Sequence, residues 1–320
     1  MTAIPTIDDV KEAAARIKGI VHRTPVMTSA GLNDRVDAQV FCKCENFQKA
    51  GAFKFRGAVN AVMSLPDAEA NRGVATHSSG NHGAALALAA RFRGVPASIV
   101  MPSNAPDSKK AAVAAYGGDI VFCEPTLEAR ESTLASVVRK TGAVFVHPYN
   151  NASVIAGQGT AALELCAEIP GLDVILAPVG GGGLISGTAL TAAACGAGTR
   201  VVAAEPEAAD DAYRSLQAGR ILPANDPKTV ADGLRTSLGE LTFAIIRSQV
   251  AQVVTVSEEA TVAAMRYVWE RMKIIIEPSS AVPVAALLDG RLDVAGQRVG
   301  VILTGGNVDL ARLPWIPSPS

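Results

Sequence analysis

Short, continuous apolar runs alternate with alanine-rich segments of helical length along most of this chain. Because these runs do not alternate with polar residues, they predict strands buried on both faces, as in a parallel sheet. A helix after each strand then returns the chain, so the pattern predicts an α/β fold with helices on both faces of the sheet. The clearest strand and helix pairs are 73–76 with 81–92, 98–101 with 107–116, 119–122 with 126–140, 174–178 with 183–194, and 200–204 with 208–218.

Composition and charge narrow the classes of function. Of the 320 residues, 49% are apolar and 18% are charged, which is typical of a compact globular protein. A net charge of −1 gives no broad basic surface, so neither nucleic acid nor an anionic membrane is expected as a partner. No run of about 18 uncharged apolar residues predicts a membrane span. The first residues lack the apolar core of an export signal, so we expect a cytoplasmic protein.

The cysteines are few and scattered. They form no CxxC motif and are odd in number. This pattern predicts buried, reduced thiols, as in a cytosolic protein. The cysteines are Cys42, Cys44, Cys123, Cys166 and Cys195.

Four glycine-containing loops stand out, each where an expected strand leads to a helix, and the first contains Lys54. This lysine begins an alanine-containing segment and is flanked by Phe53 and Phe55. The apolar neighbours and the positive end of a helix dipole both disfavour its ammonium form. A neutral lysine amine can form a Schiff base with an aldehyde cofactor. Taken alone, Lys54 is better explained as one of the many solvated lysines at helix starts.

The second loop, THSSGNHGA at 76–84, contains hydroxyl and amide side chains at the expected start of a helix. Together with the free backbone N–H groups of that helix, these side chains can bind a carboxylate. A simple serine or asparagine helix cap is the better explanation of the segment when it is considered alone.

The third loop, PVGGGGLISG at 178–187, contains four consecutive glycines before an expected helix. Glycines let backbone N–H groups close around a phosphate at a helix N-terminus. The run does not match GxGxxG, because Ser186 stands where the last glycine belongs, and no Gly-Lys-Ser/Thr follows as in a P-loop. The loop therefore predicts the phosphate site of a cofactor other than a dinucleotide.

The fourth loop follows the strand expected at 299–303 and begins with Thr304. A hydroxyl at the carboxyl end of a strand is well placed to contact a ligand in an α/β sheet. An ordinary strand-ending turn explains this loop as well.

Taken together, the four loops resemble those of the serine/threonine dehydratase and serine racemase family of fold-type-II pyridoxal-phosphate enzymes. The resemblance runs from about Ile7 to Trp315. It implies the fold of the tryptophan synthase β chain, with the cofactor in a cleft between two parallel-sheet domains. The large domain would comprise 1–72 and 147–320, and the small mobile domain 73–146. It also implies a homodimer.

The resemblance gives each loop a role. Lys54 would hold pyridoxal phosphate through a Schiff base, with Phe53 against the ring, and would take the Cα proton of the substrate. Thr304 would face the ring nitrogen, and Asn81 the ring hydroxyl. The phosphate would be bound by Gly180, Gly181, Gly182 and Gly183. The substrate carboxylate would be bound by Ser78, Ser79, Asn81 and His82.

The implied reaction is elimination of the hydroxyl group of a β-hydroxy amino acid, followed by hydrolysis to a keto acid and ammonia. The cofactor is the electron sink, and the protein selects which bond at Cα breaks. The family more often has serine at the position of Thr304, and a neutral hydroxyl there suits elimination better than transamination. Ser79 would lie on the substrate face opposite Lys54, which allows racemisation as a side activity.

The resemblance also implies a divalent-cation site in EPEAADD at 205–211. Its ligands would be the carboxylates of Glu205 and Asp211 and the carbonyl of Ala209. Oxygen ligands favour Mg²⁺ or Ca²⁺ over zinc. A solvated acidic helix start is the alternative interpretation.

Arg130 bears on which hydroxy amino acid is the substrate. It resembles an arginine that meets a second carboxylate in serine racemases and hydroxyaspartate dehydratases, and an arginine fork binds a carboxylate with two hydrogen bonds. A surface arginine beside Glu128 or Glu131 is an equal alternative.

The segments 204–215, 277–283 and 304–310 resemble the bacterial β-hydroxyaspartate dehydratase branch, whereas 232–237 fits general serine/threonine dehydratases equally well. Hydroxyaspartate, serine and threonine therefore all stay open as substrates.

Rival interpretations fit less well. A β-replacement enzyme of the cysteine synthase type shares the lysine and the glycine loop, but SSGNH at 78–82 is the dehydratase-like form of the carboxylate loop. A non-catalytic protein that binds pyridoxal phosphate has no need of Lys54. A nicotinamide dehydrogenase lacks its glycine fingerprint here.

Overall fold

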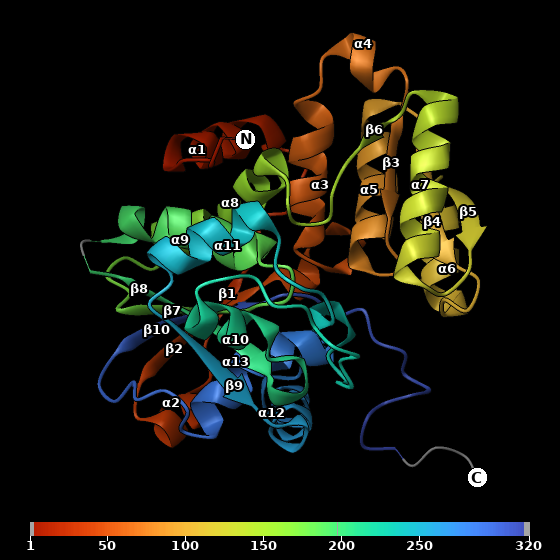
Figure 1. Cartoon of the computed structure of the whole chain (residues 1–320). Coiled ribbons are helices and arrows are strands. Elements are labelled where there is room, and N and C mark those ends of the chain that lie inside the picture. Colours follow the sequence, from red (N-terminus) through yellow and green to blue (C-terminus); the bar gives the residue numbers. More distant parts are fainter. Residues whose placement is uncertain (1–2, 197, 317–320) are drawn as a thin grey trace.

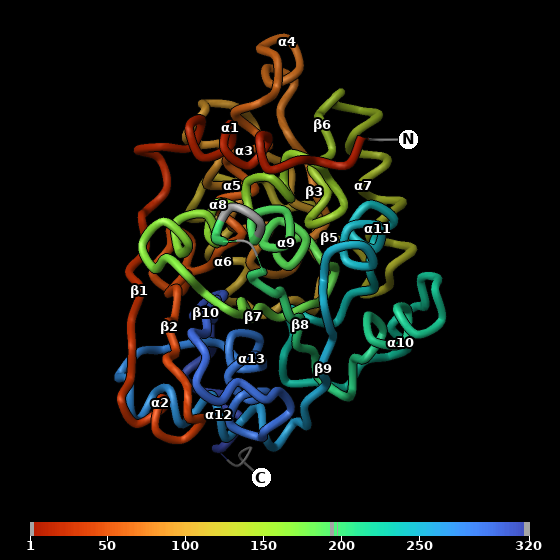
Figure 2. The backbone as a smooth tube through the Cα atoms, turned by 90° about the vertical axis from the view of Figure 1, so that its left-hand side faces the viewer, coloured from red at the N-terminus to blue at the C-terminus, as the bar shows by residue number. Residues whose placement is uncertain are grey.

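Two sheets form the framework of the protein. The computed structural model describes residues 3–196 and 198–316. The first sheet has the order β1-β2-β10-β7-β8-β9, and all neighbouring strands run parallel except β1 and β2 (Figure 2). The second sheet has the order β5-β4-β3-β6 and is parallel throughout. The strands are β1 (Val26–Met27), β2 (Gln39–Cys44), β3 (Val74–His77), β4 (Ala97–Pro102), β5 (Asp119–Cys123), β6 (Val144–Phe145), β7 (Val174–Pro178), β8 (Arg200–Pro206), β9 (Gln252–Val256) and β10 (Arg298–Leu303).

Helices cover both faces of the six-stranded sheet (Figure 1). One face packs against α1 (Ile7–Ile17), α8 (Ala152–Glu168), α9 (Gly183–Cys195) and α11 (Glu240–Gln249). The other packs against α2 (Ala30–Val36), α12 (Glu258–Met272) and α13 (Pro278–Leu288). Since the strands between these layers are buried on both sides, their apolar runs are continuous, as the sequence predicted.

The four-stranded sheet is also covered on both faces. Helices α3 (Lys54–Met63), α5 (Asn81–Arg93) and α6 (Asp107–Ala115) lie on one face, and α7 (Leu127–Thr141) lies on the other. Two short helices, α4 (Asp67–Ala70) and α10 (Asp211–Ala218), complete the named set. The predicted α/β class with parallel sheets and helices on both faces is therefore confirmed.

All five predicted strand and helix pairs are present, with ends shifted by a few residues. The predicted strand-to-helix position is wrong for the fourth glycine loop, because β10 leads into irregular chain through residue 316. The first loop also differs, since two 3-10 turns at Glu45–Phe47 and Lys49–Gly51 stand between β2 and α3. The second sheet is built from strands within 74–145, but the domain boundaries at 73 and 146 stay a prediction.

The prediction of reduced, buried cysteines is wrong for three of the five. Cys166 on α8 and Cys195 on α9 form a disulfide across a Cα–Cα distance of 4.9 Å. The two helices pack closely because Gly159 and Gly187 face each other, which leaves the cysteines within reach. Cys42 and Cys44 are free and buried, and Cys123 is free but half-buried.

Among the described residues, no helix is both long and apolar enough to cross a membrane.

Candidate active site

The structure brings the first, second and fourth glycine loops together at the carboxyl ends of β2, β3 and β10. The backbone N–H of Phe53 donates a hydrogen bond of 2.9 Å to the carbonyl of Thr304. Asn307 joins the same two loops to the second one, because its side-chain amide donates to Asn81 at 3.0 Å and to the carbonyl of Ala50 at 2.8 Å. Residues that are far apart in the sequence therefore share one site, as expected at the strand ends of an α/β sheet.

Lys54 is the first residue of α3, and its amine lies inside this site. The Nζ atom donates to the carbonyl of Pro148 at 3.0 Å and lies 5.2 Å from the centre of the Phe53 ring. Removal from water lowers the pKa of Lys54 to about 8, and the nearby carboxyl group of Glu277 limits the fall. A substantial neutral fraction near pH 8 is what Schiff-base formation with an aldehyde requires.

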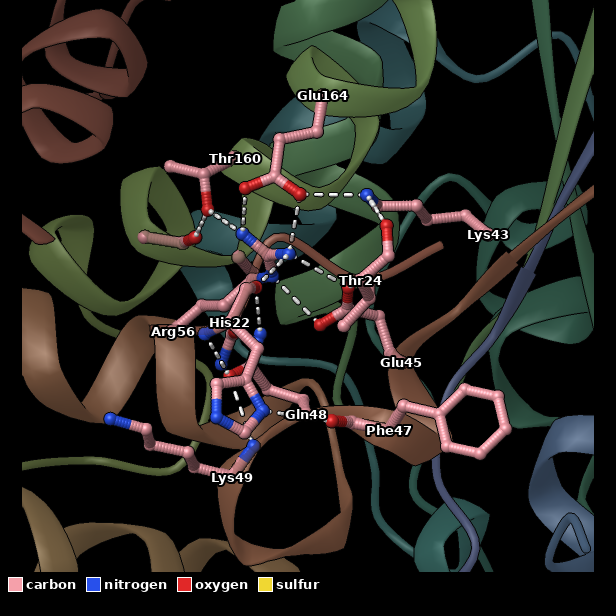
Figure 3. Close-up of polar contacts among 12 residues, drawn as sticks. His22, Thr24, Lys43, Glu45, Phe47, Gln48, Lys49, Arg56, Thr160 and Glu164 are labelled. Atoms are coloured by element: carbon pink, nitrogen blue, oxygen red, sulfur yellow. Dashed lines mark hydrogen bonds and ion pairs between the residues drawn. The ribbon is translucent and has the colours of Figure 1, made fainter. Parts of the chain in front are cut away.

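Arg56 lies on α3, two residues after Lys54, and fixes this helix through a buried cluster of ion pairs (Figure 3). It is fully buried and donates to both carboxylate oxygens of Glu45 at 2.7 and 2.8 Å. It also donates to both oxygens of Glu164 on α8 at 2.8 Å. Lys43 completes the cluster, because its amine donates to Glu164 at 2.7 Å. The cluster balances two positive charges with two negative charges, so it ties α3 to β2 and α8 without an unpaired buried charge.

Gln48 holds the turn that leads to Lys54 (Figure 3). Its side-chain oxygen accepts from the backbone N–H groups of His22 and Lys49 at 2.9 and 3.0 Å, and its amide donates to the carbonyl of His22 at 2.8 Å. Ala50 then adopts a positive φ of 57°, which turns the chain into α3. The position of Lys54 thus depends on contacts on both sides of its loop.

The second loop has the form expected of a carboxylate site, with one difference. Ser78 and Ser79 are half-buried between β3 and α5, where the first N–H groups of the helix lack partners within the helix. The ring of His82 points elsewhere, because its Nε2 lies 3.2 Å from the carbonyl of Val146. Burial and nearby positive charge lower the pKa of His82 to about 3, so the ring is neutral. Only the backbone N–H of His82 is thus available to a carboxylate.

The glycine run leads into the N-terminus of α9 and leaves no room for side chains at its four positions. A Cβ on Gly181 would lie 2.3 Å from the ring of Tyr149, and one on Gly180 would lie 2.9 Å from the backbone of Leu234. Gly182 adopts a φ of 88° and precedes the helix directly. Gly183 would place a Cβ 3.0 Å from Tyr149. Close backbone approach and free N–H groups at a helix start fit the phosphate of pyridoxal phosphate.

Thr304 is buried at the end of β10, and its hydroxyl contacts that of Ser280 at 2.9 Å. No carboxylate forms a hydrogen bond with either hydroxyl among the described residues. The side chain can therefore present a neutral hydroxyl group to a cofactor ring, as the sequence predicted.

Arg130 lies half-buried near the start of α7 and carries no ion pair within 4.0 Å among the described residues. Its Nε donates to the carbonyl of Thr126 at 3.3 Å, and neither Glu128 nor Glu131 pairs with it. Burial and then the charge of Arg130 lower the pKa of His77, which ends β3 directly before the carboxylate loop. An unpaired guanidinium beside this loop can receive a second carboxylate.

Three residues of the site were not predicted from the sequence: Glu277, His147 and Ser280. Glu277 is buried, and its carboxylate accepts from the Asn81 amide at 2.9 and 3.1 Å. Burial raises the pKa of Glu277 to about 7. His147 accepts from the backbone N–H groups of Tyr149 and Asn150, and burial lowers its pKa to about 4. Its place after β6 was a usable signal. Glu277 and Ser280 lie in the segment 277–283, whose resemblance was noted, but no local feature of this helix start gives them a role in the site.

The predicted metal ligands lie where β8 leads into α10: Glu205 is in β8, Ala209 is in the turn that follows, and Asp211 begins α10. Glu205 and Asp211 are both buried, and one oxygen of Asp211 has no hydrogen-bond partner. Burial raises the pKa of Glu205 to about 9 and that of Asp211 to about 7. The described residues contain no group of three or more histidine, cysteine, aspartate or glutamate side chains that could hold a metal. The two buried carboxylates, with one Asp211 oxygen that has no hydrogen-bond partner among the described residues, nevertheless fit the predicted ligands of a divalent cation. The third predicted ligand is the carbonyl of Ala209.

Comparisons with known proteins agree with this geometry. Residues 17–305 match the family model described as pyridoxal-phosphate dependent enzyme. The beta-hydroxyaspartate dehydratase of Paracoccus denitrificans is 54% identical over 98% of this chain and 99% of the relative. The L-threo-3-hydroxyaspartate ammonia-lyase of Saccharomyces cerevisiae is 47% identical over 97% and 95%. The structure of maize serine racemase aligns with a TM-score of 0.94 at 47% identity, covering 97% and 95% of the two chains.

The fold and the site define a fold-type-II enzyme with a lysine, a glycine phosphate loop and a carboxylate loop that follow the carboxyl ends of parallel strands. The chain belongs to the family of pyridoxal-phosphate-dependent enzymes. The resemblance inferred from the four loops is thereby confirmed, and so is pyridoxal phosphate as the cofactor.

Proposed function

We propose that the protein is a dehydratase that removes water from 3-hydroxyaspartate and releases an imino acid, or a keto acid and ammonia after hydrolysis. The observation that carries this substrate is Arg130, whose half-buried guanidinium beside the carboxylate loop has no acidic partner in the part of the chain that the structure describes. Serine and threonine have no second carboxylate to pair with it. The names of the Paracoccus and yeast relatives support the same substrate class.

Bound pyridoxal phosphate supplies the electron sink that acidifies the Cα–H bond of an attached amino acid. Lys54 binds the cofactor and, once displaced by substrate, accepts the Cα proton as a neutral amine. Its lowered pKa supports this role, because a general base needs a pKa near the working pH. The β-hydroxyl group then leaves as water, with the proton that Lys54 took from Cα.

The other site residues bind and orient. The α-carboxylate is held by the hydroxyls of Ser78 and Ser79 and by the first N–H groups of α5, including that of His82. Asn81 contacts the ring hydroxyl, Phe53 packs against the ring, and Thr304 faces the ring nitrogen. The phosphate is held by Gly180, Gly181, Gly182 and Gly183.

A divalent cation, Mg²⁺ or Ca²⁺, is part of the proposal. Glu205, Asp211 and the carbonyl of Ala209 supply oxygen ligands, which both ions prefer. Its role is structural, because the loop follows β8 and joins α10 to the sheet.

The homodimer, the cytoplasmic location and the two-domain division at 73 and 146 also stand as expectations from the resemblance.

Racemisation is a second candidate activity. Ser79 is half-buried at the start of α5 and supplies a hydroxyl that can return a proton to the face opposite Lys54. The likeness to maize serine racemase supports this activity.

A substrate panel tests the proposal. Keto-acid release would be measured with the isomers of 3-hydroxyaspartate, L-serine and L-threonine, and D-amino acids would be assayed in the same mixtures. A preference of at least tenfold in kcat/KM for one hydroxyaspartate isomer is the expected result. Equal or faster turnover of serine or threonine would make the enzyme a general dehydratase.

A further inference from the structure

Ser280 and Thr304 form a pair of buried hydroxyl groups next to the backbone of Gly305. The two oxygens are 2.9 Å apart, and their side chains are 0% and 2% exposed. Ser280 Oγ accepts from the N–H of Gly305 at 2.7 Å and lies 2.8 Å from the carbonyl of the same residue. Ser280 is the third residue of α13, so its position is set by the helix.

A serine hydroxyl has one proton, so Ser280 donates to only one of its two possible acceptors. If it donates to the carbonyl of Gly305, Thr304 donates to Ser280 and offers only lone pairs to a cofactor. If it donates to Thr304, the Thr304 proton is free to point at the cofactor. The direction of one hydrogen bond therefore decides whether Thr304 acts toward the ring as a donor or as an acceptor.

Three observations favour donation from Ser280 to Thr304. The carbonyl of Gly305 already accepts from the N–H of Glu277 at 2.9 Å and does not need a second donor. The carboxylate of Glu277 is bonded to Asn81, and no carboxylate of the described residues forms a hydrogen bond with Thr304, so Thr304 is not backed by an anion that would hold a proton on the ring nitrogen. The N-terminus of α13, with its positive partial charge, also lies at this hydroxyl pair and disfavours a pyridinium. A neutral ring nitrogen is an acceptor and needs a donor.

We propose that Ser280 is a positioning residue that donates to Thr304 and thereby directs the Thr304 proton at the ring nitrogen of pyridoxal phosphate. The hydrogen bonds then run in one direction, from Gly305 N–H through Ser280 and Thr304 to the ring. Each bond strengthens the next, because a hydroxyl that accepts becomes a better donor. The inference rests on the assignment of Thr304 to the ring nitrogen in the proposed function.

The test is the nitrogen-15 resonance of the ring in holoenzyme loaded with cofactor labelled at that atom. The wild-type resonance is expected at the position of a neutral, hydrogen-bonded pyridine. In Ser280→Ala it shifts toward that of a neutral pyridine without a donor, and the dissociation constant of the cofactor rises roughly three- to tenfold. Ser280→Cys, which keeps a weak donor, gives an intermediate shift and serves if the alanine variant does not fold.

Ser279→Ala is the matched control. It removes the same atom from the neighbouring residue of the same helix, but the Ser279 hydroxyl accepts from Gly233 N–H at 3.2 Å and does not contact Thr304. The ring resonance is expected to match that of the wild type.

Two results would overturn the proposal. A wild-type resonance at the position of a protonated pyridine would mean that Thr304 accepts from the ring. An unchanged resonance in both Ser280 variants would mean that Ser280 does not orient Thr304.

Thr304→Val distinguishes a failure of this inference from a failure of the proposed function. If this variant too leaves the resonance unchanged, the assignment of Thr304 to the ring nitrogen is wrong. If it shifts while the Ser280 variants do not, only the role of Ser280 fails.

Discussion

Arg56 and Glu45 form a two-pronged ion pair with N–O distances of 2.7 and 2.8 Å, and neither side chain is exposed to solvent. Arg56 lies two residues along α3 from Lys54, so the pair secures the helix that presents the reactive amine. Removal of one partner leaves the other charge buried without water, whereas replacement of both by apolar residues is often close to neutral. The two residues are therefore strongly coupled.

Arg56→Met is expected to lower the free energy of unfolding by about 3–5 kcal/mol, since Glu45 then loses its partner in a buried site. The double variant Arg56→Met/Glu45→Leu is expected to recover part of that loss. Denaturant unfolding of the three proteins measures both effects. A double variant that is less stable than Arg56→Met by the full cost of a second disruption would contradict the coupling.

Arg23→Met is the matched control, because Arg23 pairs with Glu168 at 3.7 Å on the surface, where the side chains are 65% and 37% exposed. Exposed pairs contribute about 0–1 kcal/mol, so this variant should unfold at nearly the wild-type denaturant concentration.

Much of the fold could be predicted because parallel strands leave continuous apolar runs, but α8 could not. Its sequence contains Gly157 and Gly159, which are unfavourable in a helix interior and indicate a loop. In the structure these glycines allow close contact, since a Cβ on Gly157 would lie 2.6 Å from Gly57 on α3. A strand before the first loop was expected, but the burial of Lys43 in β2 was not, because it depends on a pairing with Glu164, 121 residues away.

The site could be predicted where its chemistry is local. Lys54 and the four glycines lie in short segments whose residue types indicate their role. Ser280 and Glu277 act through contacts with residues 24 and 196 positions away, so no window of sequence shows them together. The disulfide between Cys166 and Cys195 was missed because only the packing of two helices brings the cysteines together.

The rate at which the apoenzyme binds pyridoxal phosphate covalently is expected to rise with pH, with a midpoint at about pH 8, and then to level off. Only the neutral amine attacks the aldehyde, and burial lowers the pKa of Lys54 to about 8. Absorbance after rapid mixing measures this rate across the pH range. A midpoint near 10, the value of an unperturbed lysine, would show that the amine is solvated. Lys54→Ala should lack the absorbance band that borohydride abolishes in the wild type.

Arg130→Ala is expected to lower kcat/KM for 3-hydroxyaspartate roughly 100-fold, or about 3 kcal/mol, because it removes a charged hydrogen-bond donor to the second carboxylate. Turnover of L-serine should change less than threefold. Arg139→Ala, an exposed arginine at the other end of α7, is the control and should behave as wild type toward both substrates. An equal loss toward serine and hydroxyaspartate would assign Arg130 a structural role instead.

Glu205 and Asp211 predict a stability that depends on pH and on divalent cations. Burial raises the pKa of Glu205 to about 9 and that of Asp211 to about 7, so the folded protein holds these protons more tightly than the unfolded chain does. Stability of the metal-free protein is therefore greatest below about pH 4 for these groups, and this contribution is lost as the pH rises to about 9. A cation binds the ionised carboxylates, so its stabilising effect should increase over the same range.

At a concentration about 100-fold above its dissociation constant, Mg²⁺ or Ca²⁺ should add about 2.7 kcal/mol at pH 8 and much less at pH 6. Thermal unfolding with chelator and with each cation measures the difference. Asp211→Asn should abolish the response, because it removes the oxygen that has no hydrogen-bond partner. Asp210→Asn, one residue earlier and paired with Arg214 at 2.7 Å, should retain it. A response that survives Asp211→Asn would place the cation elsewhere, because a site built on two buried carboxylates cannot keep its affinity when one of them becomes an amide.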